Sequence, residues 1–186
     1  MKNKFSLAAL SLALVGLATL PVQGAMVAQM NLGEMTFNAG MIARVEVLDV
    51  EQTSMNLGGG ELPVVEYTLA VVDPIKGTFD MSKGAAVVTV RMVGSLKETP
   101  PAHGVQKVSV LPEMPQLQIG HDYLLFTTEP SPIGLSAPVG LAQGAFGIYT
   151  AGKVEMATNE LGNAGLFEGP VTYDELVSAV NAELGQ

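Results

Sequence analysis

Residues 41–50 read MIARVEVLDV, and this stretch decides the class of fold. Between Arg44 and Val47 polar and aliphatic side chains alternate, which is the period of a strand with one buried face. The alternation slips at Leu48, and one extra residue in a β-bulge would explain that slip. We therefore predict a half-buried strand over residues 41–50 with a bulge near Leu48.

Similar apolar runs recur along the chain, separated by segments that share its 21 glycines and 11 prolines. This spacing is typical of an all-β domain with many turns. The predicted main strands are residues 64–73, 85–94, 121–128 and 141–150, with shorter strands at 105–111 and after Gly152-Lys153. Residues 64–73 are apolar enough to be buried on both faces. The predicted turns are residues 54–63 and 73–77.

The hydrophobic period changes at the C-terminus. Thr172 is followed three residues later by Glu175, which is the capping-box pattern of a helix start. The apolar residues at helical spacing are Leu176, Val177, Val180 and Leu184. We predict one amphipathic helix over residues 171–186 that packs on the β-domain, with binding of a partner as its alternative role.

The first 24 residues have the pattern of a secretory signal peptide. Lys2 and Lys4 precede an apolar run over residues 5–20, and Pro21 then ends that run before a small residue, Gly24. An uncleaved membrane anchor is disfavoured, because the apolar run is short for a bilayer span. We predict cleavage after Gly24, export to the periplasm or the medium, and no membrane span in the mature chain.

Composition narrows the classes of function. Export would remove Lys2 and Lys4, leaving seven basic residues against 18 acidic ones, so the net charge would change from −9 to −11. Such a chain repels phosphate backbones, which argues against nucleic acid as a partner. The chain has no cysteine, so hydrophobic packing without disulfides must hold the fold, and a catalytic thiol is excluded.

Five runs carry a resemblance to a known architecture: IARVEVLDV, YTLAVVDPIKG, VTVRMVGS, LQIGHDYLLF and LAQGAFGIY. Their order over residues 41–150 resembles a group of exported bacterial proteins with an OB-like barrel akin to the netrin/tissue-inhibitor-of-metalloproteinase module. The resemblance implies a mainly β fold, an OB-like Greek-key β-barrel with one C-terminal α-helix. The animal inhibitors act through an amino-terminal cysteine, which this chain lacks, so their mechanism does not carry over.

The expected organisation has four parts: a signal peptide at residues 1–24, an N-terminal segment at 25–40, the β-barrel at 41–170 and the helix at 171–186.

The residues of hydrolytic chemistry do not form a set. His121 and His103 are the candidate bases, but His121 and Asp122 would point to opposite faces if the strand began there. GLSAP at residues 134–138 lacks the last glycine of a nucleophile elbow. GIYTAGKV at residues 147–154 lacks the hydroxyl residue of a phosphate-binding loop and predicts a β-turn instead. We therefore predict a protein that is not an enzyme.

Metal ligands are also sparse. The sequence has neither H-E-x-x-H nor a calcium-loop pattern. Four methionines near the start, Met26, Met30, Met35 and Met41, could bind Cu(I) through their thioethers, although methionine is more often an adaptable core residue. No cofactor or metal site is predicted, and copper binding in the cell envelope stays as an alternative.

Two proline-containing loops are the predicted contact surface. Residues 95–118 and 129–140 are long, and proline lowers the entropy lost on binding. OB barrels that bind nucleic acids or sugars use aromatic platforms, but the chain has no tryptophan, and we expect Tyr123 and Phe126 in the core. The sequence favours an exported, non-enzymatic binding module with a protein partner. A self-associating envelope or matrix component is the other alternative.

Overall fold

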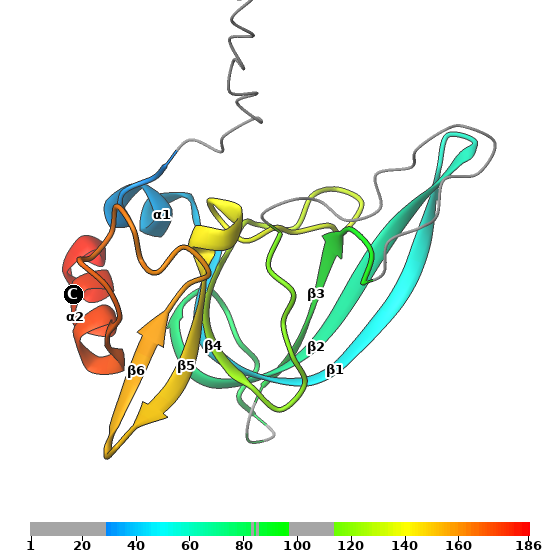
Figure 1. Ribbon diagram of the computed structural model, residues 1–186. Coiled ribbons are helices and arrows are strands. Elements are labelled where there is room, and N and C mark those ends of the chain that lie inside the picture. Colours follow the sequence, from blue (N-terminus) through cyan, green and yellow to red (C-terminus); the bar gives the residue numbers. More distant parts are fainter. Residues whose placement is uncertain (1–28, 83, 85, 97–113) are drawn as a thin grey trace, which may run out of the picture.

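The computed structural model describes residues 29–82, 84, 86–96 and 114–186. These residues form one antiparallel sheet of seven strands in the order β3-β2-β1-β4-β5-β6-β7, accompanied by two α-helices (Figure 1). The elements are α1 (Leu32–Asn38), β1 (Met41–Leu57), β2 (Gly60–Lys76), β3 (Val87–Val93), β4 (Asp122–Thr127), the 3₁₀ turn η1 (Leu141–Gly144), β5 (Ala145–Ala151), β6 (Val154–Thr158), β7 (Val171–Thr172) and α2 (Tyr173–Leu184).

The mainly β class and the C-terminal helix are therefore confirmed. The sheet curls, but within the described residues no strand pairing closes it into a barrel. The predicted signal peptide at residues 1–24, the predicted strand at 105–111, and both Met26 and His103 lie outside the described residues.

Strands β1 and β2 form one long hairpin that projects beyond the rest of the sheet (Figure 1). Its turn consists of Gly58 and Gly59 alone, both at positive φ, as the tight primed hairpin turns require. The predicted turn at residues 54–63 is therefore too long. The predicted turn at residues 73–77 is wrong, because β2 continues through Pro74 to Lys76. A proline fits in a strand where the ladder is interrupted, and register shifts flank Pro74.

Three register shifts in this hairpin decide which face of the sheet each side chain occupies. The shift between Val47 and Asp49 confirms the bulge predicted at Leu48. In β2, Val72 and Ile75 have no residue opposite them in β1. Successive β1 residues pair with Lys76, Pro74, Asp73 and Val71, so the ladder skips residues 75 and 72. Each unmatched residue reverses the alternation of the side chains that follow it.

The sheet buries side chains on both faces, in two separate cores. The inner core lies within the curl of the sheet and includes Ala43, Val45, Val47, Val65, Tyr67, Leu69, Val90, Met92, Leu117 and Leu125. The helix-side core lies between the sheet and the helices and includes Met35, Ile42, Leu124, Phe126, Phe146, Ala157, Tyr173, Leu176 and Val180. Ile42 and Ala43 are neighbours in sequence but belong to different cores, as strand alternation requires.

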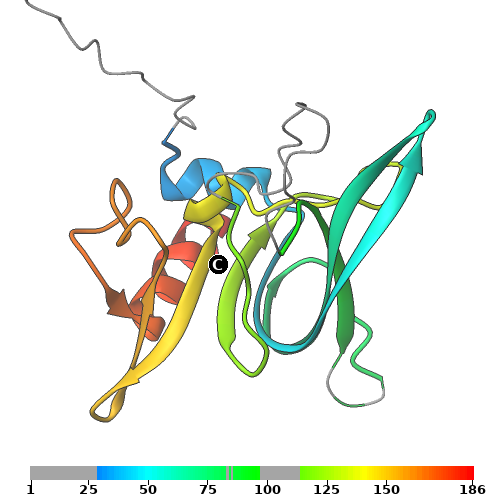
Figure 2. The same ribbon diagram turned by 45° about the vertical axis from the view of Figure 1, so that its right-hand side comes forward.

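The prediction that residues 64–73 are buried on both faces is wrong. Val65, Tyr67 and Leu69 lie in the inner core, whereas Val72 is 52% exposed on the outside. The helices pack beside β5 and β6 (Figure 2), so most of the outer face of β2 has no layer covering it.

Helix α2 has Thr172 as its N-cap, with one of the two hydrogen bonds of the predicted capping box. The Thr172 hydroxyl accepts a hydrogen bond from the Glu175 backbone N–H, and Leu176 and Val180 are fully buried against the sheet. The helix starts at Tyr173, after the short strand β7, and not at residue 171. No helix in the described part of the chain is long and apolar enough to cross a membrane.

Helix α1 lies in the segment for which no structure was predicted. Asn31 and Glu34 form a complete capping box at its start. At its end, the Lys76 ammonium donates hydrogen bonds to the carbonyl oxygens of Thr36 and Phe37, at 2.8 and 3.2 Å. A cation at this position complements the partial negative charge of the helix C-terminus, and the last turn of α1 has no basic residue of its own to do so.

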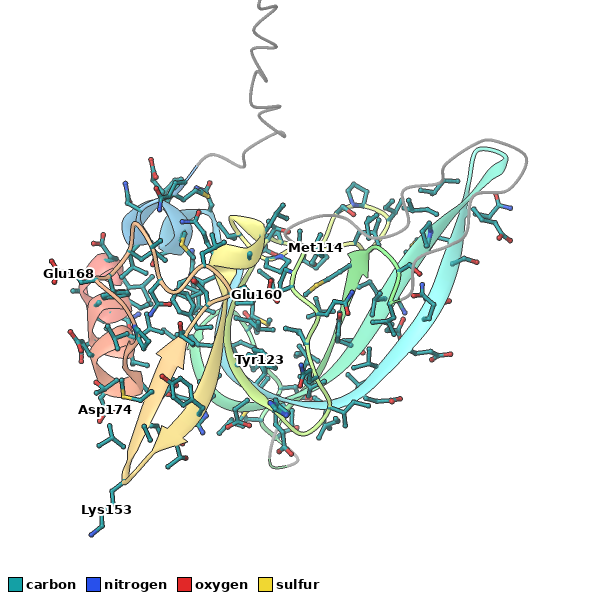
Figure 3. The ribbon with its side chains drawn as sticks, in the orientation of Figure 1. Met114, Tyr123, Lys153, Glu160, Glu168 and Asp174 are labelled. Carbon is teal, nitrogen blue, oxygen red and sulfur yellow. The ribbon has the colours of Figure 1, made fainter. Side chains whose placement is uncertain are left out.

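The strand predicted at residues 141–150 is confirmed only from Ala145 onward. Gly140 and Leu141 both have positive φ, so the chain turns through η1 before it becomes extended. Beyond β5, the chain reverses at Gly152 and Lys153 into β6, which confirms the β-turn and the short strand. Lys153 points away from the molecule at the tip of this hairpin (Figure 3).

Truncation of the α2 anchor should show how much the helix-side core stabilises the protein. Leu176→Ala removes a fully buried side chain, so the free energy of unfolding should fall by about 2–5 kcal/mol in urea denaturation. Leu161→Ala, which truncates a leucine that is 47% exposed, should cost less than about 1 kcal/mol. Equal losses would mean that α2 contributes little to the fold.

Candidate functional site

A pocket of about 380 Å³ opens at one end of the curled sheet. Its walls come from the start of β1, the connection between β2 and β3, the middle of β3, the end of β4 and the following loop. The apolar part of the lining consists of Met41, Phe79, Val88, Val90 and Pro130. We call this the mouth pocket, and its volume lies in the range of small-ligand sites.

The polar part of the lining has many hydroxyls and one charge. The hydroxyl groups belong to Thr78, Thr89, Thr127, Thr128 and Ser136, and Glu129 supplies a carboxylate. None of the lining residues is basic. The pocket is therefore rich in hydrogen-bond acceptors and carries a negative charge.

Thr127 is the most buried of these hydroxyl residues, with 2% of its surface exposed. It follows Leu125 at strand spacing, so its side chain lies on the inner face of the sheet. Among the hydrogen bonds of the described residues, none uses the Thr127 hydroxyl, whereas that of Thr128 accepts the Ala137 N–H. Among the described residues only Thr36 Oγ1 is both fully buried and unpaired, so the Thr127 hydroxyl keeps some contact with the open space of the pocket and is available to a bound molecule.

Residues 129–140 form a fixed wall of the pocket. The Ser136 N–H donates to the Arg91 carbonyl oxygen of β3 at 2.8 Å, and the Val139 N–H donates to the Phe126 carbonyl oxygen of β4 at 2.7 Å. An isolated bridge pairs Thr127 with Pro138. The loop therefore connects two sheet segments and is held in place by backbone hydrogen bonds.

The other loop predicted for contact, residues 95–118, is described only at its ends. Leu117 is buried in the inner core, and Met114 packs against that core together with Tyr123 (Figure 3). The Tyr123 hydroxyl accepts a hydrogen bond from the Gln118 N–H at 3.2 Å. The described end of this segment therefore serves the fold, and it gives no support to the predicted contact surface.

The strongest charge cluster of the described residues surrounds Arg44 on the helix side of the sheet. Its Nε and Nη2 donate to Asp122 Oδ2 at 2.8 and 2.6 Å, while Nη1 and Nη2 donate to the two carboxylate oxygens of Glu155, each at 2.8 Å. These bonds raise the pKa of Arg44, and they lower the pKa of Glu155. The cluster ties β1 to β4 and β6.

Tyr173 extends this cluster to α2. Its ring centroid lies 5.0 Å from the Arg44 guanidinium carbon, and its hydroxyl donates to Asp73 Oδ2 at 2.8 Å. Burial raises the pKa of Tyr173 well above its ordinary value, and the nearby Asp73 charge raises it further. Each of these polar groups has a partner within the protein, as expected of a structural connection.

His121 and Asp122 differ from expectation in one respect. The strand begins at Asp122, so His121 stays in the preceding turn, and both residues line one shallow depression of about 260 Å³. The expectation that they point to opposite faces assumed a strand that begins at His121, and that condition is not met. The Asp122 carboxylate bonds to Arg44, and no hydrogen bond joins the two side chains in the described structure. They do not form a catalytic pair in this arrangement.

The methionines proposed for copper do not gather in the described part of the chain. Met30 and Met35 belong to the helix-side core, and Met41 packs against the inner core on the other face of the sheet. Within the described residues, no group of three or more His, Cys, Asp or Glu side chains could hold a metal ion. The thioethers found here fill core space.

Two arginine–carboxylate pairs with the same shortest distance, 2.6 Å, allow a matched test of burial. The Arg44 side chain is 16% exposed, whereas that of Arg91, which pairs with Glu66, is 46% exposed. Arg44→Met should lower the free energy of unfolding by about 1–3 kcal/mol, because it leaves two carboxylates unpaired. Arg91→Met should cost less than about 1 kcal/mol. Equal costs in urea denaturation would contradict a structural role for the Arg44 cluster.

The raised pKa of Tyr173 predicts a loss of stability in alkali. The unfolded chain releases this phenolic proton near its ordinary pKa of about 10, while the folded chain retains it. The contribution is therefore complete below about pH 10 and declines as the pH rises further. Urea denaturation at increasing alkaline pH should show a shallower decline for Tyr173→Phe, and an intermediate one for Asp73→Asn. A wild-type decline in Tyr173→Phe would refute the assignment.

Comparison of the chain with protein-family models, with curated proteins and with solved structures gives no significant match.

Proposed function

We propose that this chain is an exported, non-enzymatic module that binds a partner protein at the mouth pocket, with residues 129–140 as one wall. The observation that carries the proposal is the Thr127 hydroxyl, which belongs to a buried residue, lines the pocket and has no hydrogen-bond partner among the described residues. A ligand that pairs with such a group binds more tightly, because it forms a hydrogen bond that the protein leaves unmade.

The rigidity of the wall also supports binding. Ser136 and Val139 are tied by backbone hydrogen bonds to β3 and β4, so little conformational entropy is lost there when a partner docks. Because the pocket already has its shape, the partner must supply a protruding group that fits it.

We further propose that the fold is an OB-like Greek-key barrel akin to the netrin/tissue-inhibitor-of-metalloproteinase module. The neighbour order β4-β1-β2-β3, with a long connection from β3 to β4, supports a Greek-key arrangement. The Ser136–Arg91 hydrogen bond supports closure at one end, since it joins the loop after β4 to the edge strand β3. Such barrels serve many functions, so the pocket carries the functional argument.

Affinity capture with a matched pair of variants tests the binding site. The full chain, tagged after Gln186 and exported by the source cell, would be compared with Thr78→Trp and Thr53→Trp. Both threonines are exposed, but only Thr78 lines the mouth pocket. A partner that saturates the wild type and Thr53→Trp should be lost from Thr78→Trp, because the indole fills the pocket.

Undiminished capture by Thr78→Trp would refute the proposed site. Recovery of the tagged chain alone would refute the binding module and favour a self-associating envelope component. Circular dichroism of the three proteins shows that each retains its β structure.

A further inference from the structure

We infer that the mouth pocket receives a lysine side chain presented by the partner protein. This inference rests on the proposed function and adds the chemistry of the group that is recognised.

The charge of the lining selects the sign of the ligand. Glu129 is the only charged residue in the lining, and the chain as a whole has a net charge of −9. A carboxylate or phosphate entering the pocket would meet repulsion without a compensating cation. A cationic group would be attracted both by Glu129 and by the field of the whole protein.

The side chain of Glu129 lies close to the backbone of Gly40. A Cβ atom at Gly40 would lie 2.6 Å from both Cγ and Cδ of Glu129, so only glycine allows this contact. The Gly40 N–H also donates to the Thr127 carbonyl oxygen at 2.8 Å, which places the start of β1 beside the end of β4. Glu129 therefore lies beside the start of β1, in the pocket that Thr127 also lines.

The hydrogen-bonding groups fit an ammonium better than a guanidinium. An ammonium has three donors and no acceptor, and hydroxyl and carboxylate oxygens accept them. The Thr127 hydroxyl has no other partner among the described residues, and Glu129 adds a charged acceptor. A guanidinium brings five donors in one rigid plane, whereas the hydroxyl groups of this pocket come from several separate segments around it, so an ammonium, whose donors point in different directions, fits them better.

The apolar lining suits the aliphatic stem of lysine. Met41, Val88, Val90 and the Phe79 ring offer methyl, methylene and aromatic surface beside the hydroxyl groups. Lysine buries its methylene chain against such surfaces while its charged end contacts polar atoms. A short polar cation would leave this part of the lining exposed to water.

Capped pentapeptides provide a direct test, titrated into the ¹⁵N-labelled protein purified after export. Gly-Gly-Lys-Gly-Gly should shift the amide resonances of Thr78, Thr89, Thr127 and Thr128 in a saturable manner. Acetylation of the lysine should weaken binding by about tenfold or more, since it removes a charged hydrogen bond. The arginine peptide should bind more weakly than the lysine peptide.

Charge-matched variants locate the recognition. Glu129→Gln should weaken the lysine peptide by about tenfold and leave the acetyl-lysine peptide unchanged. Glu160→Gln removes one exposed carboxylate that does not line the pocket and should change neither. Equal binding of the lysine and acetyl-lysine peptides, an unaffected Glu129→Gln, or shifts confined to other residues would each overturn the inference.

Further results distinguish a partner's lysine from a free amine as the source of the ammonium. They also distinguish failure of the lysine inference from failure of the proposed site. If free n-butylamine saturates the pocket but does not displace the captured partner, the ligand is a small amine and the lysine of a partner is refuted. If Thr78→Trp abolishes partner capture but acetylation of the partner's lysines does not, the lysine inference fails and the proposed site stands. If Thr78→Trp leaves capture intact, the proposed site itself fails.

Discussion

The register of the β1–β2 ladder is the constraint on which the rest of this structure depends. Two unmatched residues in β2, Val72 and Ile75, turn Asp73 and Lys76 towards the helix side of the sheet. On that side Asp73 accepts a hydrogen bond from the hydroxyl of Tyr173 on α2, and Lys76 donates hydrogen bonds to carbonyl oxygens at the end of α1. A strand without these interruptions would place the two charged residues on different faces, and one helix would lose its polar anchor.

This arrangement also explains why the mouth pocket opens from the inner face of the sheet. Both helices cover the outer face at β4, β5 and β6, so the inner core must be enclosed by the curl of the sheet itself. At one end the curl is enclosed by residues 129–140 and by the connection after β2, and these segments leave the pocket between them. The pocket is therefore a consequence of where the helices pack, and residues 129–140 contribute to both the fold and the pocket.

Local sequence signals predicted the elements whose structure is determined locally. The alternation from Arg44 to Val47 indicated β1, and the slip at Leu48 indicated its bulge. The pair of Thr172 and Glu175 indicated the start of α2. Residues 73–77 misled because Pro74 is a strong turn signal, yet the ladder with β1 continues past it through two register shifts. Helix α1 was missed although Asn31 and Glu34 carry a capping signal, because the helix has only seven residues and its hydrophobic period is short.

The mouth pocket could not be predicted in the same way, because its lining comes from five separated segments. Gly40, Phe79, Val88, Thr127 and Ser136 have no shared local pattern, and only the tertiary fold brings them together. The loop at residues 129–140 was identified from its prolines, but its role as a fixed wall depends on the Arg91 carbonyl oxygen of a distant strand.

Hydrogen-bond pairing distinguishes the two polar regions of the molecule. Around Arg44, the guanidinium, both carboxylates and the Tyr173 hydroxyl are all paired with one another or with Asp73, so a ligand would have to replace bonds already made. In the mouth pocket the Thr127 hydroxyl lines the cavity and is unpaired within the described residues, so a ligand would complete a bond that the fold leaves open. The Arg44 cluster is therefore a structural connection, whereas the mouth pocket leaves a hydroxyl that a bound molecule could pair with.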